Sequence, residues 1–166
     1  KGLASARAQV LEGLSLLLDH ARRIGVALAV EPMHPMYAGD RSCVTSLAEA
    51  LAICDELDPE GHGGVATAID VYHVWWDWKL ADGIAEAGRK GRIAAFHVCD
   101  WLVPTKDPLL DRGMMGDGVI DLSGIRSLVE AAGFEGFVEV EIFSNPWWSR
   151  PEQEILEACA RSLPLI

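Results

Sequence analysis

Four side chains that can bind a metal ion occur at or near the carboxyl ends of short apolar runs in this sequence. The runs cover residues 26–31, 65–70, 93–98 and 137–141, and they carry Glu31, Asp70, His97 and Glu141. Each run has the length and the β-branched or aromatic content of a buried strand. Because the carboxyl ends of parallel strands share one edge of a sheet, the four side chains are expected to converge. Three carboxylates beside an imidazole would repel one another without a cation, which predicts a divalent metal site.

Glu139 is a second candidate on the last of these runs. It shares strand parity with Glu141, because side chains alternate between the two faces of a strand, so either could supply the fourth ligand. Glu141 is preferred because it lies nearer the carboxyl end. Helix capping or a solvated strand end could explain any one of these acidic residues taken alone. Recurrence at four strand ends favours a metal site.

Three further side chains are candidates for contact with a substrate. His73 lies three residues beyond the second run, and His34 lies three residues beyond the first. Arg112 is one of two cations in the long segment at residues 99–118. A segment of that length in a compact domain is usually functional. The structural alternatives are a hydrogen-bonded loop histidine in the first two cases and, for Arg112, an ion pair with Asp111 or Asp117.

The tryptophans cluster in the segments that follow the predicted strands. All six lie beyond the second, third or fourth strand: Trp75, Trp76, Trp78, Trp101, Trp147 and Trp148. Residues of this type at the rim of a sheet suit the apolar face of a sugar ring, and Trp75 and Trp101 are the candidates for that contact. Packing of the long loops is the alternative explanation.

The elements that would position these residues alternate regularly. A helix is predicted over residues 1–23 with Gly25 as its break, and each of the four strands is followed by another helix. The first of those helices covers residues 47–57, the next two end near Lys90 and Ala132, and the last begins around Pro151. This order predicts a parallel sheet with right-handed crossovers.

Residues 1–166 are therefore predicted to form a single α/β domain of the (β/α) TIM-barrel type with about four β/α units. A complete barrel has eight units and about 250 residues, so four units make half a barrel. An isolated half-barrel would expose two sheet edges. A homo-oligomer or a missing N-terminal half-barrel is expected to complete it. Since the first residue is Lys1, the chain is expected to be a fragment or a processed form.

Composition narrows the class of partner. The net charge of −11, with Lys and Arg scattered along the sequence, disfavours binding to nucleic acid. No apolar run approaches the roughly 20 residues of a membrane helix, so no membrane association is expected. The four cysteines form no CxxC spacing, which favours reduced thiols and a cytoplasmic protein.

The ordered set of motifs resembles the xylose isomerase-like TIM barrel superfamily, which includes sugar and sugar-phosphate isomerases and epimerases. The resemblance rests on Glu31, Asp70-x-x-His73, His97, Gly116-x-Gly118-x-Ile120-Asp121 and Glu141. It covers nearly the whole chain and matches the C-terminal half of the barrel, strands five to eight. It implies that Glu31, Asp70, His97 and Glu141 hold one divalent ion, namely manganese, magnesium, cobalt or zinc.

The reaction implied by this resemblance is metal-dependent isomerisation or epimerisation of a sugar or sugar phosphate, in carbohydrate metabolism. Glu31 and Glu141 would exchange a proton through an enediolate, while His73 and Arg112 would contact the substrate. One alternative is a dehydratase, a lyase acting on a keto-sugar or keto-inositol at the same metal site. Another is a non-catalytic half-barrel used for dimerisation or binding. Apurinic endonucleases of the superfamily have Asp-x-His where this chain has Asp111-Arg112-Gly113, which disfavours DNA repair.

Overall fold

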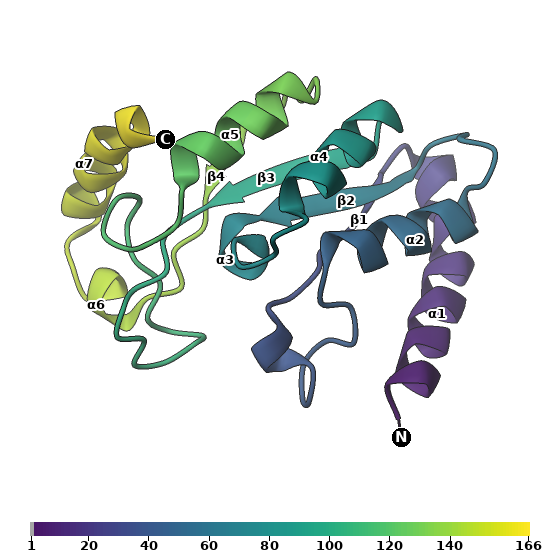
Figure 1. The fold of residues 1–166 in the computed structure, drawn as a ribbon, viewed down its shortest axis with the longest axis horizontal. Helices are drawn as coiled ribbons and strands as arrows, with labels where there is room; N and C mark the ends of the chain where they lie inside the picture. Colours follow the sequence, from purple (N-terminus) through teal and green to yellow (C-terminus); the bar gives the residue numbers. More distant parts are fainter. Residues whose placement is uncertain (1) are drawn as a thin grey trace.

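A computed structural model describes residues 2–166 of the chain. Its helices and strands alternate as the apolar pattern predicts, with a few short helices added (Figure 1). In chain order the elements are α1 (Leu3–Ile24), β1 (Leu28–Val30), the 3₁₀ helix η1 (Pro35–Tyr37), α2 (Leu47–Leu57), β2 (Val65–Asp70), α3 (Val71–Val74), α4 (Leu80–Arg89), β3 (Ile93–Val98), α5 (Leu122–Ala131), β4 (Val138–Val140), α6 (Asn145–Trp148), α7 (Glu152–Ser162) and the 3₁₀ helix η2 (Leu163–Leu165).

The four strands form one parallel sheet in the order β1-β2-β3-β4. In Figure 1 the loops after β1, β3 and β4 gather on the lower side of the view. Asp70 is paired in register with His97, and His97 with Glu139. The α/β class and the parallel sheet are therefore confirmed.

The two edge strands are shorter than predicted. β1 covers Leu28–Val30 instead of residues 26–31, and β4 covers Val138–Val140 instead of 137–141. Each edge strand has one hydrogen-bonded neighbour, so its ladder ends early, and Pro32 has no N–H with which to extend the first. Glu31 and Glu141 consequently lie one residue beyond their strands, at the start of the loops.

Local sequence signals explain the helix boundaries. Gly25, with φ of 72°, ends α1 in the left-handed conformation that glycine adopts readily. The Ser46 side chain caps α2 by accepting from the N–H of Glu49, and Asp121 caps α5 by accepting from the N–H of Gly124. The short helix α6, between β4 and α7, was not predicted.

Strand alternation separates the core from the polar face of the sheet. Ile69 and Phe96 are almost fully buried in the larger apolar cluster, which also includes Ile84 of α4. Asp70 and His97 follow them directly and so point to the opposite face. In a barrel of this class, that opposite face is the interior.

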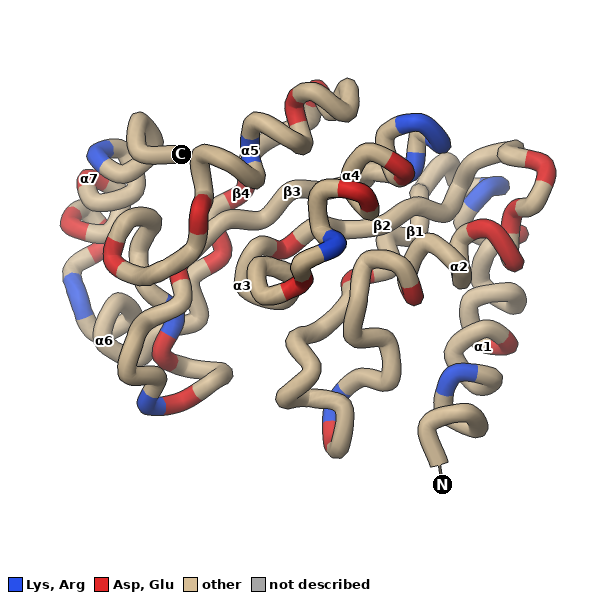
Figure 2. Tube along the Cα trace, viewed as in Figure 1, with Lys and Arg blue, Asp and Glu red and all other residues tan. Residues whose placement is uncertain are grey.

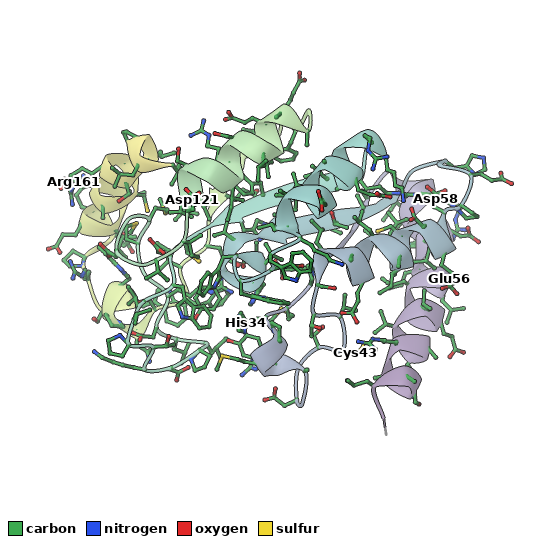
Figure 3. All side chains as sticks on the ribbon, viewed as in Figure 1. His34, Cys43, Glu56, Asp58, Asp121 and Arg161 are labelled. Atoms are coloured by element: carbon green, nitrogen blue, oxygen red, sulfur yellow. The ribbon has the colours of Figure 1, made fainter. Side chains whose placement is uncertain are left out.

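A buried ion network around Asp58 lies at the amino ends of the strands. In Figure 3, Asp58 is at the other end of the sheet from His34. Asp58 and Arg92 are 2% and 5% exposed. The Asp58 carboxylate accepts from Arg92 at 2.9 Å and from Arg22 at 2.7 Å, and also from the backbone N–H of Gly63. Burial disfavours its ionisation, but the N–H donors of Gly63 and Arg92 outweigh burial and lower the pKa of Asp58.

Acidic residues outnumber basic residues in this chain. Asp and Glu number 25 against 14 Lys and Arg, and Figure 2 shows them distributed along the chain. Across residues 2–166, no helix combines the length and apolar content needed to cross a membrane. Cys43, Cys54, Cys99 and Cys159 are free.

Replacing Asp58 with Ala should lower the free energy of unfolding by about 3 kcal/mol or more, because Arg92 is then buried without its counter-charge. Urea denaturation at neutral pH measures this, with Asp19→Ala on the exposed surface of α1 as the control. The folded pKa of Asp58 lies below its unfolded value, so its contribution is complete above the unfolded pKa and is lost as pH falls through the folded pKa. The difference between the two proteins should therefore shrink in acid. A constant difference down to low pH would contradict this account.

Candidate metal centre

The four predicted ligands come together at the carboxyl ends of the four strands. One ligand atom from each of Glu31, Asp70, His97 and Glu141 lies within 4.8 Å of the other three. Asp70 and His97 end or nearly end the two central strands, whereas Glu31 and Glu141 follow the two edge strands. The parallel sheet thus gathers residues that are 110 positions apart in the sequence.

Two atoms of this group lack the partner that buried polar atoms normally have. Oε1 of Glu31 and Nδ1 of His97 are buried, and neither has a hydrogen-bond partner among the described residues. They face each other at 3.3 Å. Carboxylates about 5 Å apart repel by about 3 kcal/mol at an effective dielectric constant of about 20. The arrangement needs positive charge among its oxygens.

Arg112 supplies part of that charge. Its Nη1 atom donates to Asp70 Oδ2 at 2.8 Å and to Glu141 Oε2 at 3.0 Å, and its guanidinium lies 4.4 Å from the ring centre of Tyr72. Burial disfavours its charge, but Asp70 and Glu141 outweigh burial and raise the pKa of Arg112. The alternative of a pair with Asp111 or Asp117 is wrong, because the side chain points inward and is 4% exposed.

The quartet fits a divalent ion. A metal ion requires a neutral His97 and ionised carboxylates. In that state the three carboxylates and the Arg112 guanidinium leave two negative charges, which a divalent cation would balance. Carboxylate oxygens and one imidazole nitrogen are ligands that zinc, manganese, cobalt and magnesium accept to differing degrees. The unpartnered Oε1 of Glu31 and Nδ1 of His97 are the atoms that such an ion would satisfy.

Glu139 takes a different position from Glu141. Its Oε2 atom lies 3.1 Å from Nε2 of His97, on the other nitrogen of the ring from Glu31. The carboxylates of Glu31, Asp70 and Glu141 raise the pKa of His97 to about 9, against the effect of burial. Of the two glutamates on the last strand, the structure therefore brings Glu141 into the quartet.

His73 lies beside the quartet, as its position three residues after Asp70 predicts. It is 1% exposed, its Nδ1 accepts from the backbone N–H of His34 at 3.1 Å, and its Nε2 is 3.1 Å from Nη2 of Arg112. Burial, followed by the charge of Arg112, lowers the pKa of His73 to about 3. It is therefore a neutral imidazole at physiological pH. Burial also raises the pKa of Asp70 to about 7, with Arg112 acting in the opposite direction.

An aromatic cluster borders the site. The His34 ring stacks on Trp101 with 4.7 Å between ring centres, and Trp101 packs on Tyr72 at 4.6 Å and Trp75 at 5.7 Å. Trp101 is only 8% exposed, so His34 covers one of its faces. Trp78 is 86% exposed and does not belong to this cluster.

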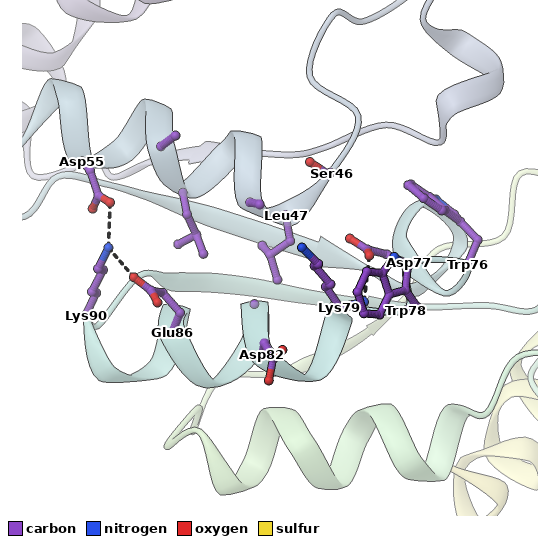
Figure 4. A pocket seen from close by; sticks show the side chains of 14 residues that line it. Ser46, Leu47, Asp55, Trp76, Asp77, Trp78, Lys79, Asp82, Glu86 and Lys90 are labelled. Atoms are coloured by element: carbon purple, nitrogen blue, oxygen red, sulfur yellow. Dashed lines mark hydrogen bonds and ion pairs between the residues drawn. The ribbon is translucent and has the colours of Figure 1, made fainter.

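Trp78 instead lines an external groove between α2 and α4, which Figure 4 shows from close by. The groove has a volume of about 580 Å³, and Lys90 at its far end pairs with Asp55 and Glu86. None of the four predicted ligands lines it. The groove is therefore separate from the candidate metal centre.

The 99–118 loop is organised by Asp100, a residue that sequence reasoning missed. The buried Asp100 carboxylate accepts four backbone N–H groups: those of Trp101, Gly116, Gly118 and Ile120, at 2.8–3.0 Å. Any side chain at Gly118 would collide with Asp100 and Trp101. The Asp100 and Gly113 backbones also pair with each other, next to Arg112. A carboxylate two residues after a strand and a later Gly-x-Gly were the signals that could have revealed this role.

The sequence pattern of the family described as xylose isomerase-like TIM barrel matches residues 1–163. The chain belongs to this family. The resemblance inferred from the spaced ligands is confirmed. No curated protein matched the sequence.

Solved structures share the xylose isomerase-like fold. A protein from Sinorhizobium meliloti 1021 has 58% identity and a TM-score of 0.94. The IolI protein with a bound zinc atom has 22% identity and a TM-score of 0.79, and D-psicose 3-epimerase, solved in the presence of D-fructose, has 18% and 0.76. The alignments cover 99%, 98% and 99% of this chain but 58%, 56% and 56% of those chains. The chain therefore spans little more than half the length of these structures.

Replacing Asp100 with Asn should loosen the 99–118 loop, because an amide nitrogen replaces one oxygen that accepts backbone N–H groups. With about 1–3 kcal/mol for each buried group left unpaired, we expect a loss of about 2 kcal/mol in unfolding free energy and faster proteolysis within the loop. Thermal denaturation and limited proteolysis measure both. Asp117→Asn, on the exposed part of the same loop, is the matched control. Equal behaviour of the two variants would refute the anchoring role.

Proposed function

We propose that this chain carries the metal-binding part of a divalent-metal-dependent sugar isomerase or epimerase. The observation that carries the proposal is the convergence of four ligand atoms within 4.8 Å, two of them buried and unpartnered among the described residues. The fold shared with D-psicose 3-epimerase and with zinc-containing IolI supports it.

The proposed ligands are Glu31, Asp70, His97 and Glu141. When bound, the ion would supply Lewis-acid chemistry, making a C–H next to a sugar carbonyl easier to deprotonate. Glu31 and Glu141 follow the two outermost strands, with Asp70 and His97 between them. One carboxylate would take the proton from carbon to leave an enediolate, and the other would return a proton to the neighbouring carbon or to the opposite face.

Neighbouring residues would orient the substrate. Arg112 holds Glu141 in place and presents a buried guanidinium, while neutral His73 offers an uncharged ring nitrogen beside it. His34 and the tryptophans behind it, Trp75 and Trp101, would form an apolar border suited to a sugar ring. This border accommodates a sugar with or without a phosphate group.

We also propose that the sheet is half of a barrel, corresponding to strands five to eight. β1 and β4 each have one strand neighbour among the described residues, and the similar solved structures are longer than this chain. Further β/α units, from an N-terminal segment or from a second copy, would cover the exposed side chains of Phe137 and Val26 at the two edges.

Metal content tests the proposal directly. Full-length protein purified without chelator should contain about one divalent ion per chain by elemental analysis. Asp70→Ala should lose the ion, because it removes a buried ligand from a central strand of the sheet. Asp82→Ala, on the exposed face of α4, should retain the ion. A wild-type chain that binds no divalent metal would contradict the proposal and favour a non-catalytic binding module.

Replacing Glu141 with Gln should abolish proton transfer. The amide cannot act as a base, so we expect kcat to fall by at least about 100-fold while the fold survives. Incorporation of solvent deuterium next to the carbonyl, screened over ketoses and their phosphates, measures the transfer, and Glu135→Gln in the preceding turn is the control. Retained exchange in Glu141→Gln would contradict its assignment. Exchange accompanied by loss of water would instead identify the dehydratase.

A further inference from the structure

Glu139 occupies the same layer of the sheet as two of the proposed ligands. Its register partner on β3 is His97, whose own partner on β2 is Asp70. Paired residues of neighbouring parallel strands project to the same face. Glu139 therefore points to the polar face of the sheet, next to His97. It precedes Glu141 by two residues and so lies farther from the carboxyl ends of the strands.

The contacts of His97 divide its two ring nitrogens between different neighbours. Nε2 lies 3.1 Å from Oε2 of Glu139. Nδ1 lies 3.3 Å from Oε1 of Glu31 and 3.9 Å from Oε2 of Glu141. Both ring nitrogens thus face carboxylates, but only Nδ1 faces carboxylates of the quartet. If Nδ1 ligates an ion, the ring hydrogen must lie on Nε2, beside a Glu139 carboxylate that can only accept it.

We propose that Glu139 is a positioning residue that fixes the tautomer and orientation of His97, so that Nδ1 is the atom offered to the metal ion. This inference rests on the proposed metal site and deepens it. With its Oε2 atom 3.1 Å from Nε2, the Glu139 carboxylate would accept the Nε2 hydrogen of the metal-bound ring and leave the lone pair on Nδ1, which faces the other ligands. It also raises the basicity of the imidazole as a donor to the ion.

The competing role for Glu139 is that of a ligand in place of Glu141. Geometry argues against it, because the four ligand atoms that lie within 4.8 Å of one another belong to the quartet with Glu141. Glu139 instead lies against Nε2, the ring nitrogen that faces away from Glu31. Its side chain is 53% exposed, so solvent competes for the Glu139 carboxylate and weakens its contact with His97. The expected effect is therefore the moderate one of an orienting residue, a change of about 10–100-fold in metal affinity.

Cobalt(II) binding to the full-length apoprotein, measured by calorimetry with cobalt chloride, tests the role. Glu139→Ala should weaken binding by about 10–100-fold, as removal of a hydrogen-bond partner from a ligating histidine does. Glu139→Gln should lie closer to wild type, because its amide oxygen still accepts from Nε2. Glu135 lies four residues before Glu139 and outside the site, so Glu135→Ala should bind cobalt as the wild type does.

Proton NMR of the cobalt-loaded proteins adds a readout that a general loss of stability would not produce. The Nε2 proton of His97 should appear as a paramagnetically shifted, exchangeable signal in the wild type and in Glu139→Gln. In Glu139→Ala this proton loses its acceptor, so its signal should broaden or disappear through exchange with water. The signal should persist in Glu135→Ala.

The outcomes separate the role of Glu139 from the metal site itself. Wild-type binding with an unchanged affinity and NMR signal in Glu139→Ala would refute the positioning role alone. A loss in Glu139→Gln as large as that in Glu141→Gln would make Glu139 a ligand and also overturn the proposal. Absence of cobalt binding by the wild type would refute the metal site and, with it, any orienting function toward it.

Discussion

The constraint on which this structure depends is the charge repulsion among Glu31, Asp70 and Glu141. The three carboxylates are brought together by neighbouring parallel strands, which end at Asp70 or one residue before Glu31 and Glu141. Arg112 pairs with two of the three carboxylates and balances one charge, and the proposed divalent ion would balance the rest. Burial, followed by the carboxylates of Glu141 and Glu31, raises the pKa of Asp70, and the neighbouring carboxylates raise the pKa of His97.

The loop architecture serves this charge balance. Arg112 reaches Asp70 from a segment with little regular secondary structure, which would be free to move without a fixed anchor. Asp100 provides that anchor by gathering four backbone N–H groups, and the pairing of its backbone with Gly113 holds the residue next to Arg112. The Asp100 carboxylate also gives hydrogen-bond partners to N–H groups that burial would otherwise leave unpaired.

The two ends of the sheet have different tasks. At the amino ends, Asp58 pairs with Arg22 and Arg92. Both oxygens of the Asp58 carboxylate have hydrogen-bond partners, as a stabilising network requires. At the carboxyl ends, Glu31 and His97 keep buried atoms without partners among the described residues. Unpartnered buried atoms cost stability, and they are tolerated where a ligand would satisfy them. This division is the usual one in barrels, which carry their sites at the carboxyl ends of the strands.

The sequence by itself determined the alternation of helices and strands, the parallel sheet and the convergence of the four ligands. Those features follow from local periodicity and from the rule that parallel strands share an edge, so residues 65–70 and 93–98 were predicted with correct bounds. Only the tertiary structure decided the partner of Arg112, the position of Glu139 beside Nε2 of His97, and the role of Asp100. These depend on side-chain direction and on contacts between distant loops, which local periodicity does not encode. The shortened edge strands have the same origin, because the length of a strand depends on its neighbours as well as on its own residues.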